Sequence, residues 1–277
     1  MSYSSLYIKR IQADMKELYK EPLDVSEGIY HHFNEANMTE AFFMIIGPKG
    51  TPYENGFYFF HFVFPPQYPF MPPIVSFCTL DGSLRFNPNL YNTGKVCLSM
   101  LNTWEGPQWT SCLTIRTILV AIRAMVLGTA NPLQNEPGFE DIFDKRNHTY
   151  NELIRHENFR VGVVKMLKHP PEAFKVFRPA MFAYVFKNAA WYVDTLRTLS
   201  ATHKDMTLTC SVYNNQITCH YTKILEDLIA LINRKTPLEC PKNHDVGFEM
   251  ASAKDGRLYV VKMVGKPPKA FKRWVLK

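Results

Sequence analysis

The stretch that decides the fold is Arg85-Phe-Asn-Pro-Asn-Leu-Tyr-Asn-Thr-Gly-Lys-Val-Cys-Leu-Ser-Met-Leu-Asn-Thr-Trp104, which presents one thiol, Cys97, behind two turns. Asn87-Pro88-Asn89 predicts the first turn, because proline restricts its own φ and the residue before it, and asparagine amides bond locally to the backbone. Asn92-Thr93-Gly94 predicts the second turn. The apolar run from Lys95 to Leu101 is too short for a helix, so Cys97 is expected on a stiff extended segment.

This stretch resembles the active-site flap of ubiquitin-conjugating enzymes, in which a His-Pro-Asn tripeptide is followed eight residues later by a cysteine within a Cys-Leu run. Here the tripeptide is Asn87-Pro88-Asn89, and Cys97 lies eight residues beyond Asn89. Asn87 stands in place of the histidine, as it does in conjugating enzymes of the Z type and in the conjugating domains of some giant hybrid ligases. The segment from Tyr150 to Leu167 and the paired Trp104 and Trp109 also resemble the Z type.

The resemblance implies an α+β fold of the ubiquitin-conjugating (UBC) type, with a four-stranded antiparallel meander flanked by helices. The residues themselves predict three of the strands, since runs rich in aromatic and β-branched residues are bounded by Gly, Pro and Asn-Gly turns. These runs are 41–46, 57–64 and 74–78. We place the catalytic core at residues 1–169 and a C-terminal basic extension, mainly helical with a terminal hairpin, at residues 170–277.

Three helices are predicted in the core. The first, over residues 5–20, has Ser4 or Ser5 as a cap and Pro22 as a stop, and the second, over 113–127, has Thr110 or Ser111 as a cap. The third covers residues 147–168. Apolar residues at helical spacing predict the buried faces: Tyr7, Ile11, Met15 and Leu18 in the first helix, and Tyr150, Ile154, Val161 and Val164 in the third.

The extension is predicted to contain a helical stretch over 172–199 interrupted at Pro179, a helix over 221–234, and a hairpin of residues 246–250 and 257–264 around Lys254-Asp255-Gly256. Its charge differs from that of the core. Residues 1–167 carry 14 Lys and Arg against 16 Asp and Glu, whereas residues 168–277 carry 18 against 9, giving −2 and +9. This charge indicates either an acidic partner, which could be a protein surface, an RNA or a membrane face, or simply a solvated basic surface.

Composition indicates a globular protein outside the membrane. Hydrophobic residues make up 46% of the 277 residues, but no apolar run reaches the roughly 18 residues of a membrane span. The six cysteines show no close-spaced framework, so we expect free thiols and a location in the cytoplasm and nucleus. No phosphate-binding glycine loop is present, so no cofactor is expected, and ATP is expected to be consumed by the activating enzyme.

A thiol at Cys97 suits acyl transfer, because a thiolate is a strong nucleophile and a thioester stays reactive toward amines. The resemblance implies that Cys97 accepts ubiquitin, or a ubiquitin-like modifier, as a glycyl thioester and passes it to lysine, as an acyltransferase. It also implies that Asn89 supports the oxyanion or the flap. Glu136 falls near the family's acidic gate, and an ordinary solvated loop glutamate is the alternative.

Further implied partners are a ubiquitin-activating enzyme, ubiquitin ligases and protein substrates, with no membrane and no expected role for nucleic acid. The basic face of the first helix, with Lys9, Arg10 and Lys16, is implied to contact the activating enzyme. Phe70 falls where family members present an aromatic side chain to ligases, although a core aromatic would give the same pattern.

Three other functions compete with this interpretation. A cysteine protease is disfavoured because the flap supplies no histidine base beside Cys97. A zinc site is disfavoured because Cys210, Cys219, His220, Cys240 and His244 form no close ligand pairs. A non-catalytic ubiquitin-binding module, or a scaffold whose basic tail binds an acidic partner, stays open.

Overall fold

The computed structural model describes residues 3–24, 27–34, 37–82, 84–141, 143–204 and 206–233, and beyond these the strands at 249–251, 258–264 and 271–276. Two compact units are present. The first comprises residues 1–166, 171–174 and 207–218, and the second comprises residues 167–170, 175–206 and 219–277. We call the first the catalytic unit, after the catalytic core that the sequence predicts for it, and the second the helical unit. The predicted boundary between residues 169 and 170 stays a prediction.

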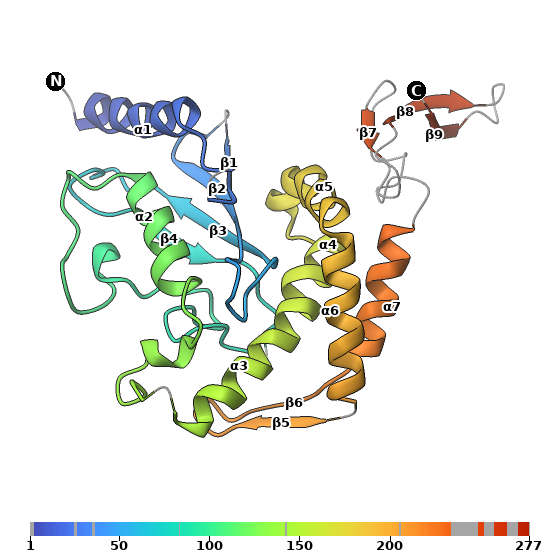
Figure 1. Ribbon diagram of the computed structural model, residues 1–277. Helices are drawn as coiled ribbons and strands as arrows, with labels where there is room; N and C mark the ends of the chain where they lie inside the picture. The colour runs from blue at the N-terminus through green and yellow to red at the C-terminus, as the bar shows by residue number, and fades with distance from the viewer. Residues whose placement is uncertain are drawn as a thin grey trace. The chain divides into compact units, whose positions relative to one another are not determined.

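A four-stranded antiparallel sheet forms the centre of the catalytic unit, with the strand order β1-β2-β3-β4 (Figure 1). The strands are β1 (Ile29–Phe33), β2 (Glu40–Ile46), β3 (Phe57–Val63) and β4 (Ile74–Phe77). The predicted meander is therefore confirmed, including the first strand, which only the resemblance implied. Phe43 pairs with Phe60 in the register of β2 and β3, and both side chains are fully buried, so this pair forms part of the hydrophobic core.

The turn between β2 and β3 explains why these two strands pair so closely. Asn55 has a φ of +60°, a value that asparagine tolerates better than most residues. A Cβ on Gly47 would lie 1.7 Å from the carbonyl oxygen of Tyr53, so no larger residue fits there. The Gly-Pro and Asn-Gly signals of the sequence thus mark real steric requirements.

Helix α1 (Tyr3–Lys20) packs through the predicted face, with Tyr7, Ile11 and Leu18 buried and Met15 half-buried. The predicted cap is wrong, because Ser4 and Ser5 lie inside the helix. The pattern of apolar residues defines a buried face well, but two adjacent serines carry little information on where the first turn begins.

Helix α2 (Ile115–Ala121) continues into a π-helical segment, η2 (Ile122–Val126). Its cap is Thr114 in place of the predicted Thr110 or Ser111. The Thr114 hydroxyl accepts from the backbone N–H of Thr117, and the Thr117 hydroxyl accepts from the N–H of Thr114. A threonine in place of the usual Glu or Gln completes this reciprocal cap, which is why the sequence signal was weak.

The third predicted helix is confirmed as a continuous helical rod made of α3 (Lys145–Glu157), the π-helical η4 (Asn158–Lys165) and α4 (Met166–Lys168). All four residues of its predicted stripe, Tyr150, Ile154, Val161 and Val164, are buried. Short 3-10 turns, η1 (Ser99–Leu101) and η3 (Pro132–Asn135), precede this rod.

Residues beyond the rod return to the catalytic unit twice. Phe174, at 3% exposure, stacks on Phe59 of β3 with ring centroids 4.6 Å apart and meets Phe42 of β2 edge-on at 5.4 Å. The hairpin of β5 (Thr207–Cys210) and β6 (Asn215–Thr218) also belongs to this unit. This hairpin was not predicted, because each strand has only four residues and a largely polar sequence.

The helical unit contains η5 (Glu172–Phe177) in part, α5 (Arg178–Lys187), α6 (Ala189–Thr202) and α7 (Tyr221–Ile232). Helices are confirmed there, but Pro179 lies in the first turn of α5 and does not interrupt a helix. Proline suits the first turn because its missing N–H has no helical partner there. The break falls at Asn188.

Three strands, β7 (Glu249–Ala251), β8 (Leu258–Val264) and β9 (Phe271–Leu276), pair antiparallel near the C-terminus. The predicted pairing of the first two is confirmed, whereas the third strand was not predicted. The turn around Lys254-Asp255-Gly256 lies outside the described residues.

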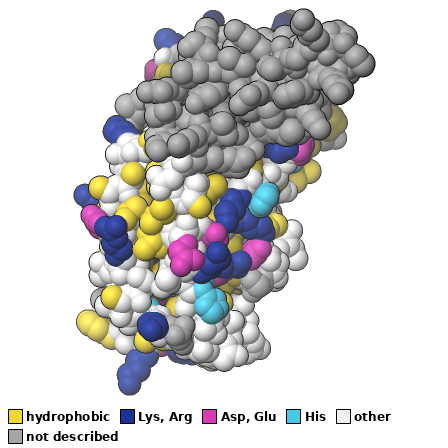
Figure 2. All heavy atoms as spheres, turned by 90° about the vertical axis from the view of Figure 1, so that its right-hand side faces the viewer, with side chains coloured by type: hydrophobic (Ala, Val, Ile, Leu, Met, Phe, Trp, Pro, Cys, Tyr) yellow, Lys and Arg dark blue, Asp and Glu magenta, His cyan; other side chains and the backbone are white. Residues whose placement is uncertain are grey.

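The basic character of the extension is partly neutralised where side chains are described. Figure 2 shows Lys and Arg side chains lying beside Asp and Glu side chains on one face. Asp227 pairs with Lys168 at 3.1 Å and with Lys223 at 3.4 Å. The net charge of the segment therefore overstates the charge that this part of the surface offers to a partner.

Candidate active site

The flap begins with the predicted turn at Asn87-Pro88-Asn89. The backbone N–H of Asn89 donates to Oδ1 of Asn87 at 2.8 Å, and the N–H of Leu90 donates to the Asn87 carbonyl at 2.9 Å. An asparagine side chain that accepts from the N–H two residues on is the Asx turn expected of this residue type. Asn87 thus closes the turn through its side chain and its backbone.

Burial of Asn87 anchors this turn in the core. Its side chain is fully buried, and its amide nitrogen donates to the hydroxyl of Tyr53 at 3.0 Å and to the carbonyl of Val126 at 2.9 Å. A histidine has neither the amide donor pair nor the carbonyl acceptor, so the local contacts fit the asparagine found here. The sequence predicted the turn and gave no signal for these distant partners.

The second predicted turn fixes the strand that leads to the thiol. Gly94 has a φ of +91°, and its carbonyl accepts from the N–H of Phe77 at 2.8 Å. A Cβ at this position would lie 3.0 Å from the Phe77 carbonyl oxygen, so glycine is needed for the close approach. Lys95 also forms a bridge with Ser76, so the flap is held at the edge of β4.

Cys97 and Asn89 hold each other through two hydrogen bonds. The N–H of Cys97 donates to the Asn89 carbonyl at 2.8 Å, and Nδ2 of Asn89 donates to the Cys97 carbonyl at 2.7 Å. Nδ2 of Asn89 therefore binds the backbone at Cys97, a contact that favours flap support over a free oxyanion donor. Both roles stay predictions.

Thr103 holds the segment after the thiol. Its hydroxyl donates to the carbonyl of Val96 at 2.9 Å and accepts from the N–H of Leu98 at 2.9 Å. Nearby, Nε1 of Trp109 donates to the Pro69 carbonyl at 2.7 Å, and Trp109 is only 8% exposed. The backbone on both sides of Cys97 is thus fixed by side chains that the apolar pattern alone did not identify.

The thiol is less accessible than the sequence suggested. Cys97 is 1% exposed, whereas Cys112 is exposed and Cys78 is intermediate. Burial raises the pKa of Cys78 to about 11, although a backbone hydrogen bond near His61 opposes that shift. Cys97 is therefore the least exposed of these three cysteines.

Glu136 occupies a structured position and is not a solvated loop residue. Its Oε2 accepts a hydrogen bond of 2.6 Å from the hydroxyl of Tyr213, which lies in the loop of the β5–β6 hairpin. The same oxygen lies 3.8 Å from a guanidinium nitrogen of Arg85. Its carboxylate is thus already occupied by two partners, and a role as an acidic gate stays a prediction.

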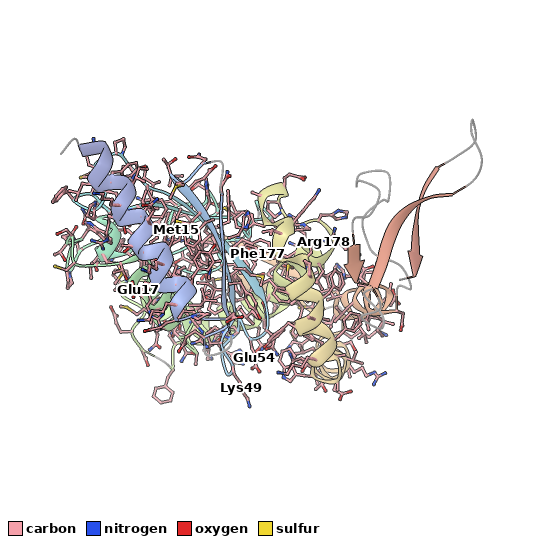
Figure 3. All side chains as sticks on the ribbon, turned by 90° about the horizontal axis from the view of Figure 1, so that it is seen from above. Met15, Glu17, Lys49, Glu54, Phe177 and Arg178 are labelled. Atoms are coloured by element: carbon pink, nitrogen blue, oxygen red, sulfur yellow. The ribbon has the colours of Figure 1, made fainter. Side chains whose placement is uncertain are left out.

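The predicted contact residues of α1 differ in exposure and in their hydrogen bonds within the unit. Figure 3 shows α1 with Met15 and Glu17 labelled. Lys9 and Lys16 are exposed and seven residues apart, so they share one face. Arg10 is instead bound within the unit, donating to the carbonyls of Ser111 and Leu113 at 2.6 Å each.

Phe70 is 60% exposed, and Met71 and Ile74 beside it are 51% and 61% exposed. The interpretation of Phe70 as a core aromatic is therefore wrong. Three exposed apolar residues at one place are typical of a protein interaction surface. The contact with a ligase stays a prediction.

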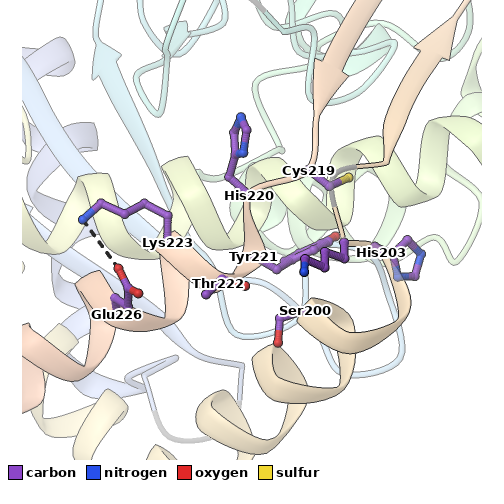
Figure 4. Close-up of a pocket in the computed structure, with 9 residues that line it drawn as sticks. Ser200, His203, Cys219, His220, Tyr221, Thr222, Lys223 and Glu226 are labelled. Atoms are coloured by element: carbon purple, nitrogen blue, oxygen red, sulfur yellow. Dashed lines mark ion pairs between the residues drawn. The ribbon is translucent and has the colours of Figure 1, made fainter.

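A pocket of about 330 Å³ lies in the helical unit, at the start of α7 (Figure 4). His203, Cys219, Lys223 and Glu226 are among its lining residues, and Lys223 lies 3.9 Å from Glu226. The lining mixes both charges, so it does not select for one class of ligand. It contains no residue of the flap.

The described residues contain neither a metal-binding cluster nor a membrane-spanning helix. No group of three or more His, Cys, Asp or Glu residues is arranged to hold a metal ion among the side chains that are described, and Cys240 and His244 lie outside them. Within the same part of the chain, every helix is too short or too polar to cross a bilayer.

Known proteins match this chain mainly over the catalytic unit. A family model described as ubiquitin-conjugating enzyme matches residues 10–158. Ubiquitin-conjugating enzyme E2 Z of Xenopus tropicalis is 43% identical over 169 residues, covering 60% of this chain and 52% of that protein. The Homo sapiens protein of the same name is 44% identical over 163 residues, covering 57% and 44%. This chain thus spans about half the length of these relatives.

Two further similarities differ in extent. The dual E2 ubiquitin-conjugating enzyme/E3 ubiquitin-protein ligase BIRC6 of Mus musculus is 32% identical over 249 residues, covering 83% of this chain and 5% of that protein. A match to 83% of this chain must run past residue 218. A solved E2 domain of a Toxoplasma gondii ubiquitin conjugating enzyme is 24% identical, with a TM-score of 0.43, and covers 56% of this chain and 97% of that one.

Proposed function

The chain belongs to the ubiquitin-conjugating enzyme family, and on that premise we propose that it accepts ubiquitin or a ubiquitin-like modifier as a glycyl thioester on Cys97. The predicted likeness to the Z type is confirmed by identities of 43–45% to proteins named ubiquitin-conjugating enzyme E2 Z. The thioester step, the modifier and the partners are the proposal.

One thiol exchange and one amine attack describe the proposed reaction. The Cys97 thiolate attacks the carbonyl carbon of the modifier's thioester on the activating enzyme, a C–S bond forms, and the activating enzyme's thiolate leaves. A lysine amine then attacks the same carbonyl, the C–N bond forms, and the Cys97 thiolate leaves while the amine loses a proton. ATP enters only at the activating enzyme, so we propose that this chain needs no cofactor.

The observation that carries the proposal is the pair of hydrogen bonds between Asn89 and Cys97. The bonds of 2.8 and 2.7 Å hold the backbone of the flap cysteine to Asn89, the asparagine that the Asn-Pro-Asn turn shares with the family's usual tripeptide. Of the two predicted roles of Asn89, this contact favours flap support, because its Nδ2 already donates to the Cys97 carbonyl. Fixing the flap also keeps the sulfur in one position relative to an incoming thioester.

Partners follow from the same proposal. We propose that Lys9 and Lys16 contact the activating enzyme and that Phe70, with Met71 and Ile74, contacts a ligase, because these side chains are exposed. Arg10 contributes to that surface only indirectly, since its guanidinium binds Ser111 and Leu113. A thiol used for transfer must stay reduced, which supports work in the cytoplasm and nucleus.

One observation favours a second candidate, a non-catalytic ubiquitin-binding module. Cys97 is 1% exposed, and a sulfur that never becomes accessible would carry no modifier. An enzyme should form a thioester with ubiquitin in a charging reaction, whereas a non-catalytic binding module should not. The two functions can therefore be separated by one experiment.

A charging experiment, in which ubiquitin is offered to Cys97 by an activating enzyme, distinguishes the conjugating enzyme from the binding module. The purified chain is incubated with activating enzyme, ATP and ubiquitin, and the products are separated with and without reducing agent. We expect an adduct that reducing agent removes, that Cys97→Ala abolishes, and that Cys112→Ala keeps. Absence of any reducible adduct with every activating enzyme and modifier tried would support the binding module.

A further inference from the structure

The β5–β6 hairpin lies outside the matched family model, which ends at residue 158, yet it is part of the catalytic unit. Its four-residue loop, 211–214, ends at Asn214 with a φ of +50°. The preceding residue, Tyr213, is half-buried. A tyrosine at the tip of a short polar hairpin is thus held against the unit that carries Cys97.

Tyr213 contacts two charged side chains of that unit. Its hydroxyl donates to Glu136 at 2.6 Å, and the guanidinium carbon of Arg85 lies 4.8 Å from the centre of its ring. Its ring also meets the ring of Tyr150 at 5.7 Å and 61°. Burial is the main cause that raises the pKa of Tyr213, and the hydrogen bond to Glu136 is the second. The phenol therefore stays protonated and remains a donor at neutral pH.

Arg85 connects these contacts to the flap. Its guanidinium donates to the carbonyl oxygen of Pro88, and it lies over the ring of Tyr91 at 3.7 Å. Its backbone carbonyl accepts from the hydroxyl of Tyr150 at 2.5 Å. Pro88 is the middle residue of the flap turn, and the next residue, Asn89, binds Cys97.

A continuous set of contacts therefore runs from the hairpin to the thiol. Tyr213 and Glu136 fix the guanidinium of Arg85, Arg85 fixes the Pro88 carbonyl, and Asn89 fixes the Cys97 backbone. The guanidinium of Arg85 contacts two aromatic rings, a carboxylate at 3.8 Å and a carbonyl acceptor, so few of its rotamers remain accessible.

We propose that Tyr213 is a positioning residue for thioester transfer, which acts through Glu136 and Arg85 to hold the flap turn that carries Cys97. This inference rests on the proposed function and extends it to a residue outside the family's common core. It gives Glu136 a structural task in place of the predicted acidic gate. It also makes the extension a working part of the catalytic unit.

The test uses the full chain with Tyr213→Phe, which removes the hydroxyl and keeps the ring, and Glu136→Gln, which keeps an acceptor oxygen. Tyr30→Phe, which removes a half-buried hydroxyl of β1, is the matched control. Two rates are measured at 25 °C. One is maleimide labelling of Cys97, resolved from the other cysteines by mass spectrometry, and the other is discharge of ubiquitin from charged Cys97 to free lysine.

For Tyr213→Phe we expect faster Cys97 labelling and discharge slowed about tenfold, as fits loss of one hydrogen bond to a charged group. Glu136→Gln should change both rates less than Glu136→Ala. The pair Tyr213→Phe and Glu136→Ala should be non-additive, because both remove the same contact. Tyr30→Phe should leave both rates unchanged.

A lower melting temperature for Tyr213→Phe with unchanged labelling and discharge at 25 °C would overturn the proposal, since it would show only an anchor for the hairpin. Labelling needs no ubiquitin. A wild-type chain that cannot be charged would therefore overturn the proposed function, while the labelling rates alone would still decide the role of Tyr213.

Discussion

The side-chain amide of Asn89 donates to the carbonyl oxygen of Cys97 at 2.7 Å, and the backbone N–H of Cys97 returns a bond of 2.8 Å to the Asn89 carbonyl. Cys97 is 1% exposed, and both bonds hold its backbone, so loosening them should increase access to the residue. We therefore expect Asn89→Ala to label with maleimide at Cys97 several times faster than the wild type. We also expect discharge to lysine to fall by about 100-fold, because the flap would no longer hold Cys97 in position for the attack.

Asn92→Ala is the control for this prediction, since Asn92 is an exposed turn residue of the same flap. It should change neither rate. If Asn89→Ala discharged lysine at the wild-type rate and labelled no faster, the clamp would have no part in transfer. Faster labelling with normal discharge would restrict Asn89 to a purely structural role.

The fold of the catalytic unit follows largely from local signals. The aromatic runs, the Gly-Pro and Asn-Gly turns and the helical stripe of α3 each specify structure within a few residues of themselves. Element ends and caps were less predictable, because Thr114 and Thr117 cap α2 by a threonine pair that has no strong sequence signature. The β5–β6 hairpin escaped prediction since two strands of four residues with alternating Thr, Asn and Gln resemble a loop.

The site was predictable where neighbours in sequence are also neighbours in space. The Asx turn at Asn87 and the spacing from Asn89 to Cys97 belong to this class. Arg85 and Tyr213 were missed because their partners lie far along the chain, and only folding brings them together. The burial of Cys97 was missed for the same reason, since coverage depends on the whole unit.

Cys78 provides a prediction about pH. Burial raises its pKa to about 11, so the neutral thiol dominates at physiological pH. Below that pKa, the reactive thiolate fraction rises about tenfold for each unit by which the pH is raised. Its maleimide labelling rate should therefore rise about tenfold per unit from pH 7 to pH 10. Cys112, which is exposed, is the internal comparison and should label fastest at pH 7. A plateau in Cys78 labelling near pH 9 would contradict the burial argument.

The ion pairs of Asp81 predict how the free energy of unfolding of the catalytic unit changes in acid. Burial opposes ionisation, but hydrogen bonds from Lys165 and Arg160 lower the pKa of this carboxyl below its usual value. A lowered pKa stabilises the fold at pH values above the unfolded value of about 3.9, and this contribution is lost as the pH falls through the folded value. Asp81→Asn should therefore lower the free energy of unfolding at pH 7 by about 1 kcal/mol, because its partners are partly exposed.

Urea unfolding at a series of pH values checks this sign. The difference between wild type and Asp81→Asn should shrink below pH 4 and stay constant from pH 6 to pH 8. Asp194→Asn, at a carboxyl that is 73% exposed, should show a much smaller difference throughout. A gap between wild type and Asp81→Asn that widens in acid would mean that the carboxyl is not held ionised by Lys165 and Arg160.

Phe174 lies beyond the α3–α4 rod, and its burial predicts that it contributes to the stability of the catalytic unit. Its ring lies 4.6 Å from that of Phe59 and 5.4 Å from that of Phe42, at 3% exposure. Phe174→Ala should lower the free energy of unfolding by about 3 kcal/mol, the usual loss for a buried phenylalanine. Val176→Ala, at a residue 48% exposed, should cost far less.

Chemical denaturation followed by tryptophan fluorescence measures both variants, and a loss below about 1 kcal/mol for Phe174→Ala would mean that the ring adds little to the sheet. The same reasoning applies to truncation. A chain cut after residue 169 lacks Phe174 and the 207–218 hairpin, both of which belong to the catalytic unit. The truncated chain should therefore be less stable than a full chain carrying Val176→Ala. A deletion changes both the stability of the catalytic unit and the function of the extension, so point variants are needed to separate the two.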